Sequence, residues 1–176
     1  DLLEFAREVV RSFNYRFNTK ALIEPQMKAT TVPKVLGLDG QKKMGKSLDN
    51  HIELAAEPEA TQKRVMQMVT DPNRMRLSDP GNPDICNVFT MHKIFSSEEE
   101  VQEINTECRR AGIGCVDCKK RFAANLNKNL EPFRARRAEL GEKPDAVWDI
   151  LHDGAKRARK LAEETMVEVR EAIQLP

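Results

Sequence analysis

Apolar residues recur at helical spacing in several separate stretches of the chain. The first stretch covers residues 1–17, where leucine, valine and phenylalanine side chains fall on one face of a helix. The most regular stretch covers residues 144–173, where charged residues flank an apolar stripe that includes Trp148. Each pattern predicts a helix, and we expect Trp148 and its stripe to lie in the core of a helical bundle.

Four more helices are predicted between these two, over residues 57–70, 86–95, 96–108 and 119–140. Ser96 or Ser97 can cap the third of them, because glutamates follow and suit the positive end of the helix dipole. Pro132 is expected to kink the fourth helix rather than end it. The chain is therefore predicted to be mainly α-helical, with a helical bundle in its C-terminal part.

The segment after the first predicted helix has a different character. Residues 18–31 mix polar side chains with a proline and are predicted to form a loop. Residues 30–36 are rich in β-branched side chains, and Pro33 would place such a short strand at an edge or an end of a sheet. Residues 37–50 combine glycines with lysines and lack apolar periodicity, so a mobile surface loop is expected there.

Length and composition bound the possible classes of protein. The chain has 176 residues, of which 40% are hydrophobic, so it can bury the core of one domain, or of one domain and part of another. It contains no signal-peptide pattern and no apolar run of about 20 residues, which a membrane helix would need. A cytoplasmic protein without a membrane partner is expected. Asp1 already lies within an amphipathic pattern, and we expect the chain to be a piece of a larger protein.

Charges of opposite sign are segregated along the chain, although the formal net charge is only +1. Residues 109–138 contain nine lysines and arginines and two acidic residues, whereas five glutamates lie within residues 98–107. A concentrated basic segment favours an anionic partner such as nucleic acid. A solvated helix face is the other interpretation, and charge alone does not separate the two.

Four cysteines are separated by 21, 6 and 2 residues, at positions Cys86, Cys108, Cys115 and Cys118. Four thiolates can complete the coordination of one structural metal centre, and a C-x-x-C pair lets two of them reach the same atom or cluster. Unrelated buried thiols are the alternative, because free cysteine is often a small core residue. Disulfides are less expected in a reducing cytoplasm, so metal ligation is the preferred interpretation.

Two lysines stand three residues apart in the glycine-containing loop, at Lys43 and Lys46. Ammonium groups on such a loop can close over a polyphosphate and balance the charge that develops as pyrophosphate leaves. The loop is not a Walker A motif, because the preceding glycine frame is absent. Lysine-rich surface loops are common, so the surrounding residues decide how the pattern is interpreted.

Residues 43–47 (KMGKS) resemble the KMSKS signature of class I aminoacyl-tRNA synthetases, with Gly45 in place of a serine. The surrounding motifs resemble those of bacterial tryptophanyl-tRNA synthetases over essentially the whole chain. These motifs are Val32-Pro33-Lys34, Val69-Thr70-Asp71-Pro72, Ser78-Asp79-Pro80-Gly81-Asn82-Pro83, Asn87-Val88-Phe89, residues 111–120, Asn129-Leu130-Glu131-Pro132 and residues 153–159.

The resemblance implies activation of tryptophan by ATP and transfer of the tryptophanyl group to tRNA, by a protein that acts with Mg²⁺ and forms a homodimer. Lys43 and Lys46 would stabilise the departing pyrophosphate, and the loop would contact ATP through Lys43, Met44, Gly45, Lys46 and Ser47. Residues 1–57 would be the tail of a Rossmann-like catalytic domain. Residues 58–176 would be the helical domain that binds the tRNA anticodon.

The cysteines resemble those of a subset of these synthetases, in which the helical domain binds a [4Fe–4S] cluster near the anticodon. The first interval is one residue shorter here, and the other two intervals match. The resemblance therefore implies a [4Fe–4S] cluster at the four cysteines, with zinc as the alternative. The basic residues directly after the last cysteine, Lys119, Lys120 and Arg121, are the candidate contacts to tRNA.

The most consequential departure from the family pattern is that the chain contains neither the HIGH signature nor the tryptophan pocket of class I synthetases. We therefore expect the isolated chain to be inactive. A non-catalytic fragment or paralogue that binds tRNA is the main alternative, and a zinc-stabilised helical domain is another.

Overall fold

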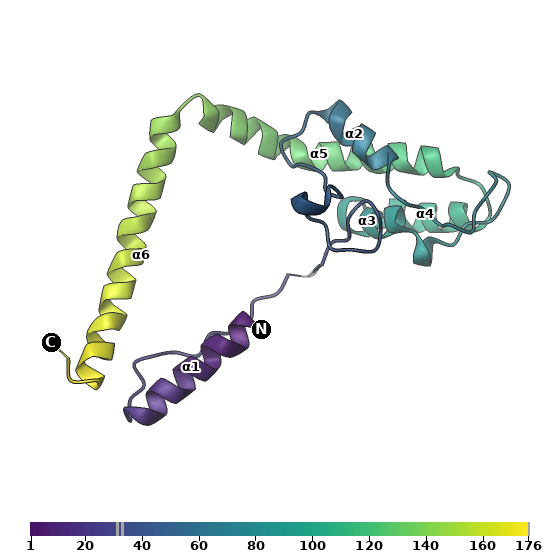
Figure 1. Cartoon of the computed structure of the whole chain (residues 1–176). Helices are drawn as coiled ribbons and strands as arrows, with labels where there is room; N and C mark the ends of the chain where they lie inside the picture. Colours follow the sequence, from purple (N-terminus) through teal and green to yellow (C-terminus); the bar gives the residue numbers. More distant parts are fainter. Residues whose placement is uncertain (31, 33, 176) are drawn as a thin grey trace. The chain divides into compact units, whose positions relative to one another are not determined.

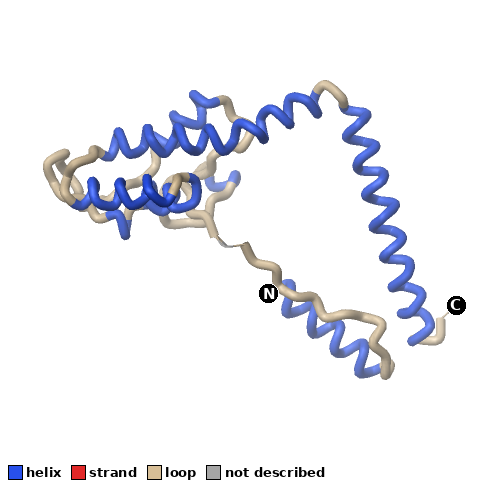
Figure 2. The backbone as a smooth tube through the Cα atoms, turned by 180° about the vertical axis from the view of Figure 1, so that it is seen from behind, coloured by secondary structure: helices blue, strands red, loops and turns tan. Residues whose placement is uncertain are grey.

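The computed structural model describes residues 1–30, 32 and 34–175, and its regular elements are all helical (Figure 1). They are α1 (Leu2–Arg16), η1 (Lys46–Leu48), α2 (Pro58–Met66), η2 (Pro83–Ile85), α3 (Asn87–Phe95), α4 (Glu98–Arg109), α5 (Cys115–Gly141) and α6 (Pro144–Ala172). The elements η1 and η2 are short 3-10 helices. No strand occurs among the described residues (Figure 2), so the prediction of a mainly α fold is confirmed.

The strand predicted over residues 30–36 is not formed in the part of this segment that the structure describes. Thr31 and Pro33 lie outside the described residues. In the remainder, the backbone makes one isolated antiparallel bridge, from Leu36 to Lys43. The bridge closes a tight turn instead of adding to a sheet.

The chain divides into two compact units. One consists of residues 1–30 together with the segment that begins at Leu140, and the other extends from Thr31 to Glu139. The second unit contains both residues 37–50, called the lysine loop below, and the four cysteines. The expected boundary after residue 57, between the tail of a catalytic domain and a helical domain, is a different division of the chain, and it stays a prediction.

The hydrophobic core lies in the second unit, where α5 runs beside α3 and α4 (Figure 1). Apolar side chains from the lysine loop, α2, α3, α4 and α5 meet there and are almost fully buried. They include Leu38, Ile52, Val65, Met68, Val88, Phe89, Met91, Ile104, Phe122, Ala123, Leu126 and Leu130. Burial of such side chains is the main favourable term in folding, so this core holds the two candidate sites on one scaffold.

Local signals account for the start of α4 and of α5. Ser97 caps α4, and its hydroxyl oxygen accepts a hydrogen bond from the Glu100 N–H at 3.3 Å. Of the two predicted caps, Ser96 and Ser97, the second is therefore the one that forms. Helix α5 begins at Cys115, four residues before the predicted start, because the Cys118 N–H already donates to the Gly114 carbonyl at 3.0 Å. The helix continues through Pro132.

Helix α2 ends at Met66, earlier than the predicted end near residue 70. The Met68 N–H donates to the Val65 carbonyl, which tightens the last turn. The Val69 N–H then leaves the helical pattern and donates to the Leu38 carbonyl at 2.9 Å. A contact with the lysine loop therefore replaces the last turn that the periodicity predicts.

Helix α6 extends over its predicted range, but its apolar stripe is not core. None of its described residues is buried, and Trp148 is 61% exposed. The prediction that Trp148 is a core residue is therefore wrong, because periodicity identifies an apolar face without identifying what covers it. Helix α1 is similar: Val10 is buried, whereas Phe5 on the same helix is 65% exposed.

None of the helices in the described part of the chain is both long enough and apolar enough to span a bilayer.

Candidate functional site

The lysine loop has a defined backbone in the second unit. Its two limbs are joined by the Gly37 N–H, which donates to the Lys42 carbonyl, and by the Met44 N–H, which donates to the Val35 carbonyl, both at 2.9 Å. The chain then forms the 3-10 helix η1 from Lys46 to Leu48. Lys43 and Lys46 are both exposed on this framework, so their ammonium groups are available to an anion.

Met44 and Gly45 occupy the positions between the two lysines. Met44 is partly buried and packs against the hydrophobic core, which anchors the loop between two exposed cations. A Cβ at Gly45 would meet nothing closer than the Lys43 carbonyl oxygen at 3.9 Å, and the Gly45 backbone is extended. The site does not require glycine here, so a serine would fit the same backbone.

Two polar residues that the sequence analysis missed hold this loop. Asn50 is buried, and its Oδ1 accepts a hydrogen bond from the Gly45 N–H at 2.9 Å, while its Nδ2 donates to Asp39 Oδ2 at 3.0 Å. Asp39 Oδ1 in turn accepts from the N–H groups of Gln41 at 2.9 Å and Lys42 at 3.1 Å. The Gln41 N–H, followed by the Asn50 amide, lowers the pKa of Asp39. The aspartate-to-glycine turn Asp39-Gly40 was the available sequence signal.

Arg64 ties the end of the loop to α2. Its Nη2 donates to the Asp49 carboxylate at 3.1 Å, and its Nε donates to the His51 carbonyl at 3.2 Å. Asp49 has a positive φ of 48°, in the left-handed region, at the point where η1 ends. The guanidinium therefore holds the turn through which the chain leaves the lysine loop.

The four cysteines lie at the ends of three helices, and all four are free thiols. Cys86 precedes α3 and is buried, Cys108 lies in the last turn of α4, and Cys115 and Cys118 lie in the first turn of α5. The η2–α3 junction, the end of α4 and the start of α5 thus bring together segments that the sequence separates.

A glycine makes room for one of these thiols. A Cβ on Gly81 would lie 2.6 Å from Cys108 Sγ, which is shorter than any acceptable contact. The Gly81 N–H also donates to the Cys108 carbonyl at 2.9 Å. Arg74 also lies beside this glycine, and its Nη1 donates to the Ile113 carbonyl at 2.8 Å and lies 4.0 Å from Cys115 Sγ.

Burial and mutual repulsion favour the protonated thiol over the thiolate at these cysteines when no metal is bound. Burial, followed by the neighbouring cysteines, raises the pKa of Cys86, of Cys108 and of Cys118, and the two effects together bring the pKa of Cys118 to about 12. A metal cation would reverse this preference, so the donor set suits one chemically. In the described part of the chain, however, no three or more His, Cys, Asp or Glu side chains are arranged as ligands of one metal ion.

His92 is fully buried beside Cys118, and its surroundings define its tautomer. Asn125 Nδ2 donates to Ser96 Oγ at 2.8 Å, which leaves the Ser96 hydroxyl hydrogen to donate to His92 Nδ1 at 2.7 Å. The Cys118 carbonyl can only accept, so His92 Nε2 is the protonated nitrogen and donates to it at 3.2 Å. Burial lowers the pKa of His92, which favours the neutral imidazole at this place.

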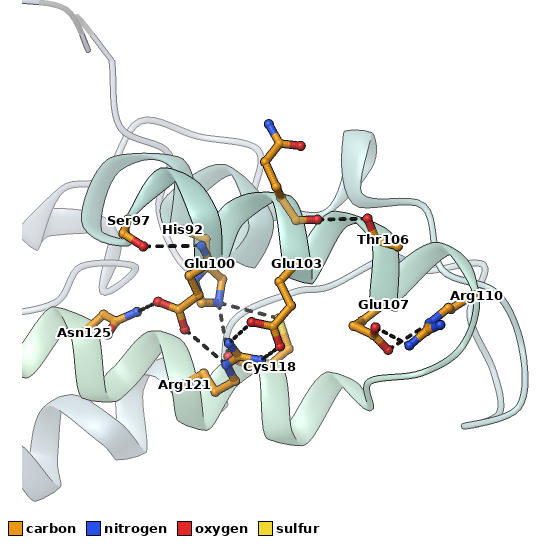
Figure 3. A network of polar contacts seen from close by, with 11 residues as sticks. His92, Ser97, Glu100, Glu103, Thr106, Glu107, Arg110, Cys118, Arg121 and Asn125 are labelled. Carbon is orange, nitrogen blue, oxygen red and sulfur yellow. Dashed lines mark hydrogen bonds and ion pairs between the residues drawn. The ribbon is translucent and has the colours of Figure 1, made fainter.

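The three candidate tRNA contacts differ in how free they are. Lys119 Nζ donates to the Met66 carbonyl at 3.0 Å. Arg121 is held between Glu100 and Glu103 of α4 (Figure 3). Lys120 is 58% exposed and lies 3.5 Å from Asp117, so it is the most accessible cation of the three.

Other cations of the basic segment also have acidic partners. Arg109 pairs with Asp84 at 2.6 Å, Arg110 pairs with Glu107 (Figure 3), and Arg136 pairs with Glu139 at 2.5 Å. The acidic and basic segments that are separate in sequence therefore neutralise each other in part. The charge that remains for an anionic partner is smaller than the sequence suggests.

Comparisons with known proteins agree with these features. Residues 1–131 match the family model described as tRNA synthetases class I (W and Y). The chain is 42% identical, over 99% of its length, to a tryptophan–tRNA ligase of Aquifex aeolicus, and 41% identical, over 98%, to one of Thermotoga maritima. It covers 44% and 52% of these two proteins, so it spans about half the length of the curated relatives it matches.

A solved structure gives the same result for the fold. The chain superposes on tryptophanyl-tRNA synthetase from Campylobacter jejuni, complexed with ADP and tryptophan, with a TM-score of 0.78 and 30% sequence identity. The match covers 98% of this chain and 53% of that one. Together with the family model, which covers most of the chain, this establishes that the chain belongs to the class I tRNA synthetases of the tryptophan and tyrosine family.

Proposed function

We propose that this chain forms the signature-loop and helical part of a tryptophan–tRNA ligase, which activates tryptophan with ATP and transfers it to tRNA. The observation that carries the proposal is the lysine loop: Lys43 and Lys46 are both exposed on a backbone that is hydrogen-bonded on either side of them. The similarity to tryptophan–tRNA ligases over nearly the whole chain supports tryptophan as the amino acid.

In the proposed reaction, Lys43 and Lys46 act with Mg²⁺ on the triphosphate of ATP. Their positive charge stabilises the pyrophosphate as its bond to the adenylate breaks, which lowers the barrier because this charge develops in the transition state. Met44, Gly45 and Ser47 hold the shape of the loop. The protein is proposed to be cytoplasmic and, at full length, a homodimer.

The test is ATP–pyrophosphate exchange by the full-length protein that carries this sequence, with tryptophan and, separately, tyrosine as the amino acid. Tryptophan should support exchange and subsequent charging of tRNA, whereas tyrosine should support neither. Exchange with tyrosine alone would contradict the assignment of tryptophan. Binding of tRNA without exchange with either amino acid would favour the non-catalytic tRNA-binding alternative.

We also propose that Cys86, Cys108, Cys115 and Cys118 hold a [4Fe–4S] cluster as a structural centre, with zinc as the competing occupant. The support is the soft four-thiolate donor set, the position of each cysteine at one of three helix ends where the thiols influence one another electrostatically, and the glycine that makes room beside Cys108. The cluster would supply a covalent link between segments of the helical part.

A tRNA surface is proposed beside these cysteines. Lys120 is its principal cation, because it is the most exposed of the three and its partner, Asp117, is itself exposed. Lys119, in contrast, is bonded to the Met66 carbonyl, and Arg121 is bonded to the glutamates of α4. Contacts from such a surface reach phosphates and therefore position the tRNA without reading its sequence.

A further inference from the structure

We propose that Asn50 is the positioning residue of the lysine loop, and that its hydrogen bond to Asp39 sets where Lys43 and Lys46 stand. The inference rests on the proposed function, because it gives those two lysines a task at ATP. Asn50 itself is buried, so it would act through the backbone of the loop.

The amide of Asn50 joins the two limbs of the loop. Its Oδ1 accepts from the Gly45 N–H, between the two lysines, and its Nδ2 donates to Asp39 Oδ2 on the preceding limb. The same Nδ2 lies 3.4 Å from the Lys43 carbonyl oxygen. Its backbone carbonyl accepts from the Leu38 N–H at 2.8 Å. One residue therefore restrains the chain on both sides of Lys43 and directly before Lys46.

A glycine allows this arrangement. A Cβ on Gly37 would lie 2.1 Å from Asn50 Nδ2, so the amide group packs directly against the Gly37 backbone. Any side chain at position 37 would push the amide away from Asp39 and Gly45. The loop is thus built around the Asn50 amide.

The same turn is attached to the helical part of the second unit by Asn87, the first residue of α3. Asn87 Nδ2 donates to the Gly37 carbonyl at 2.8 Å in a buried contact, and a Cβ on Gly40 would lie 3.1 Å from Asn87 Cβ. Gly40 has a positive φ of 66°, which lets the turn approach α3 closely. The loop lysines are therefore positioned relative to α3 through Gly37, Asn50 and Asn87.

The donor and acceptor roles in the Asn50–Asp39 contact give a reciprocal test. Asn50→Asp replaces the donor by a carboxylate oxygen that faces Asp39, so the two groups repel. Asp39→Asn places two donors opposite each other. Combining both changes restores one donor and one acceptor, and it keeps the oxygens that accept from Gly45 and from Gln41.

The experiment uses the full-length protein and two readouts, which are trypsin cleavage after Lys42, Lys43 and Lys46 without substrate, and tryptophan-dependent pyrophosphate exchange. Each single variant should raise cleavage at these lysines at least about 10-fold, because the loop opens. Each should lower the kcat of exchange at least about 10-fold with little change in the KM for tryptophan. The double variant should return both values to within about threefold of wild type.

Asn105→Asp on α4 is the matched control for the change of an amide to a carboxylate, and it should alter neither readout. Wild-type behaviour of both single variants, or a double variant no better than they are, would overturn the inference. If one single variant unfolds, as cleavage throughout the chain would reveal, the other single variant and the double variant decide in the same way. Absence of exchange in the wild-type protein would count against the proposed function, while the cleavage pattern would still decide the role of Asn50.

Discussion

Arg121 on α5 and Glu103 on α4 form a two-point ion pair, with both guanidinium-to-carboxylate hydrogen bonds at 2.9 Å (Figure 3). Arg121 Nε also donates to Glu100 Oε1 at 3.1 Å. The Glu103 carboxylate, followed by that of Glu100, raises the pKa of Arg121, which stays charged. Arg121, which the sequence analysis predicted as a tRNA contact, therefore joins α5 to α4.

Arg121→Ala should lower the midpoint of thermal unfolding by about 2–5 °C, a modest shift because the Glu103 side of the pair is half exposed and solvent screens it. Lys120→Ala, one residue away, should leave the midpoint unchanged. Circular dichroism melts of both variants measure the difference. Equal midpoints for wild type and Arg121→Ala would show that the pair adds nothing to stability.

Lys120→Ala should weaken tRNA binding by about 1 kcal/mol and reduce the slope of log K against log salt by about one, as expected for loss of one phosphate contact. Filter binding at several salt concentrations measures both quantities. Lys160→Ala on α6, a lysine in the other unit and 79% exposed, serves as the comparison for removal of a surface charge. An unaltered slope in Lys120→Ala would remove Lys120 from the proposed surface.

Lys46→Ala in the full-length protein should slow adenylate formation by about 100-fold or more, while tryptophan binding changes little. The reason is that the lysine acts mainly on charge that develops as pyrophosphate leaves. Gly45→Ser, which the open space around that residue accommodates, is the control and should remain active. Pyrophosphate exchange at the wild-type rate in Lys46→Ala would contradict a catalytic role for the loop.

Protein purified without oxygen should be brown and contain about four irons per chain. Gly81→Ala should lower that content although every ligand remains, since the added methyl group would lie 2.6 Å from Cys108 Sγ. Gly141→Ala, where a Cβ meets nothing within 4 Å, should keep the iron.

Cys118→Ser should loosen residues 86–121 and weaken tRNA binding more than ATP binding. Stoichiometric zinc without absorption near about 400 nm would exclude the cluster.

The lysine loop should loosen in acid. The folded state lowers the pKa of Asp39, mainly through the Gln41 N–H and next through Asn50, so the unfolded state binds a proton more readily. The stabilisation is complete above the ordinary pKa of about 3.9, and it is lost as the pH falls through the lower folded value. As the pH falls from about 3.9 through the folded pKa of Asp39, the exchange rates of the Gln41 and Gly45 amide hydrogens should rise relative to their intrinsic rates at the same pH. In Asp39→Asn, the acid-dependent step should disappear.

Local patterns predicted much of the helical structure. The cap at Ser97 and the glutamates after it located the start of α4 correctly, because these interactions involve residues within one turn. The end of α2 was predicted too late, because a hydrogen bond from Val69 to Leu38 competes with the helix there. Contacts over such long sequence distances leave no periodic trace in the chain.

The sequence by itself determined the helical class, the KMGKS loop and the spacing of the cysteines, because each depends on residue types close together in the chain. Only the tertiary structure decided which charges remain free and what holds the loop. Arg121 is neutralised by glutamates 18 and 21 residues earlier in the chain, on another helix, and Asn50 is oriented by Asp39, Gly37 and Asn87. Hydrogen bonds and ion pairs depend on distances of a few ångströms, which folding creates between segments that the sequence keeps apart.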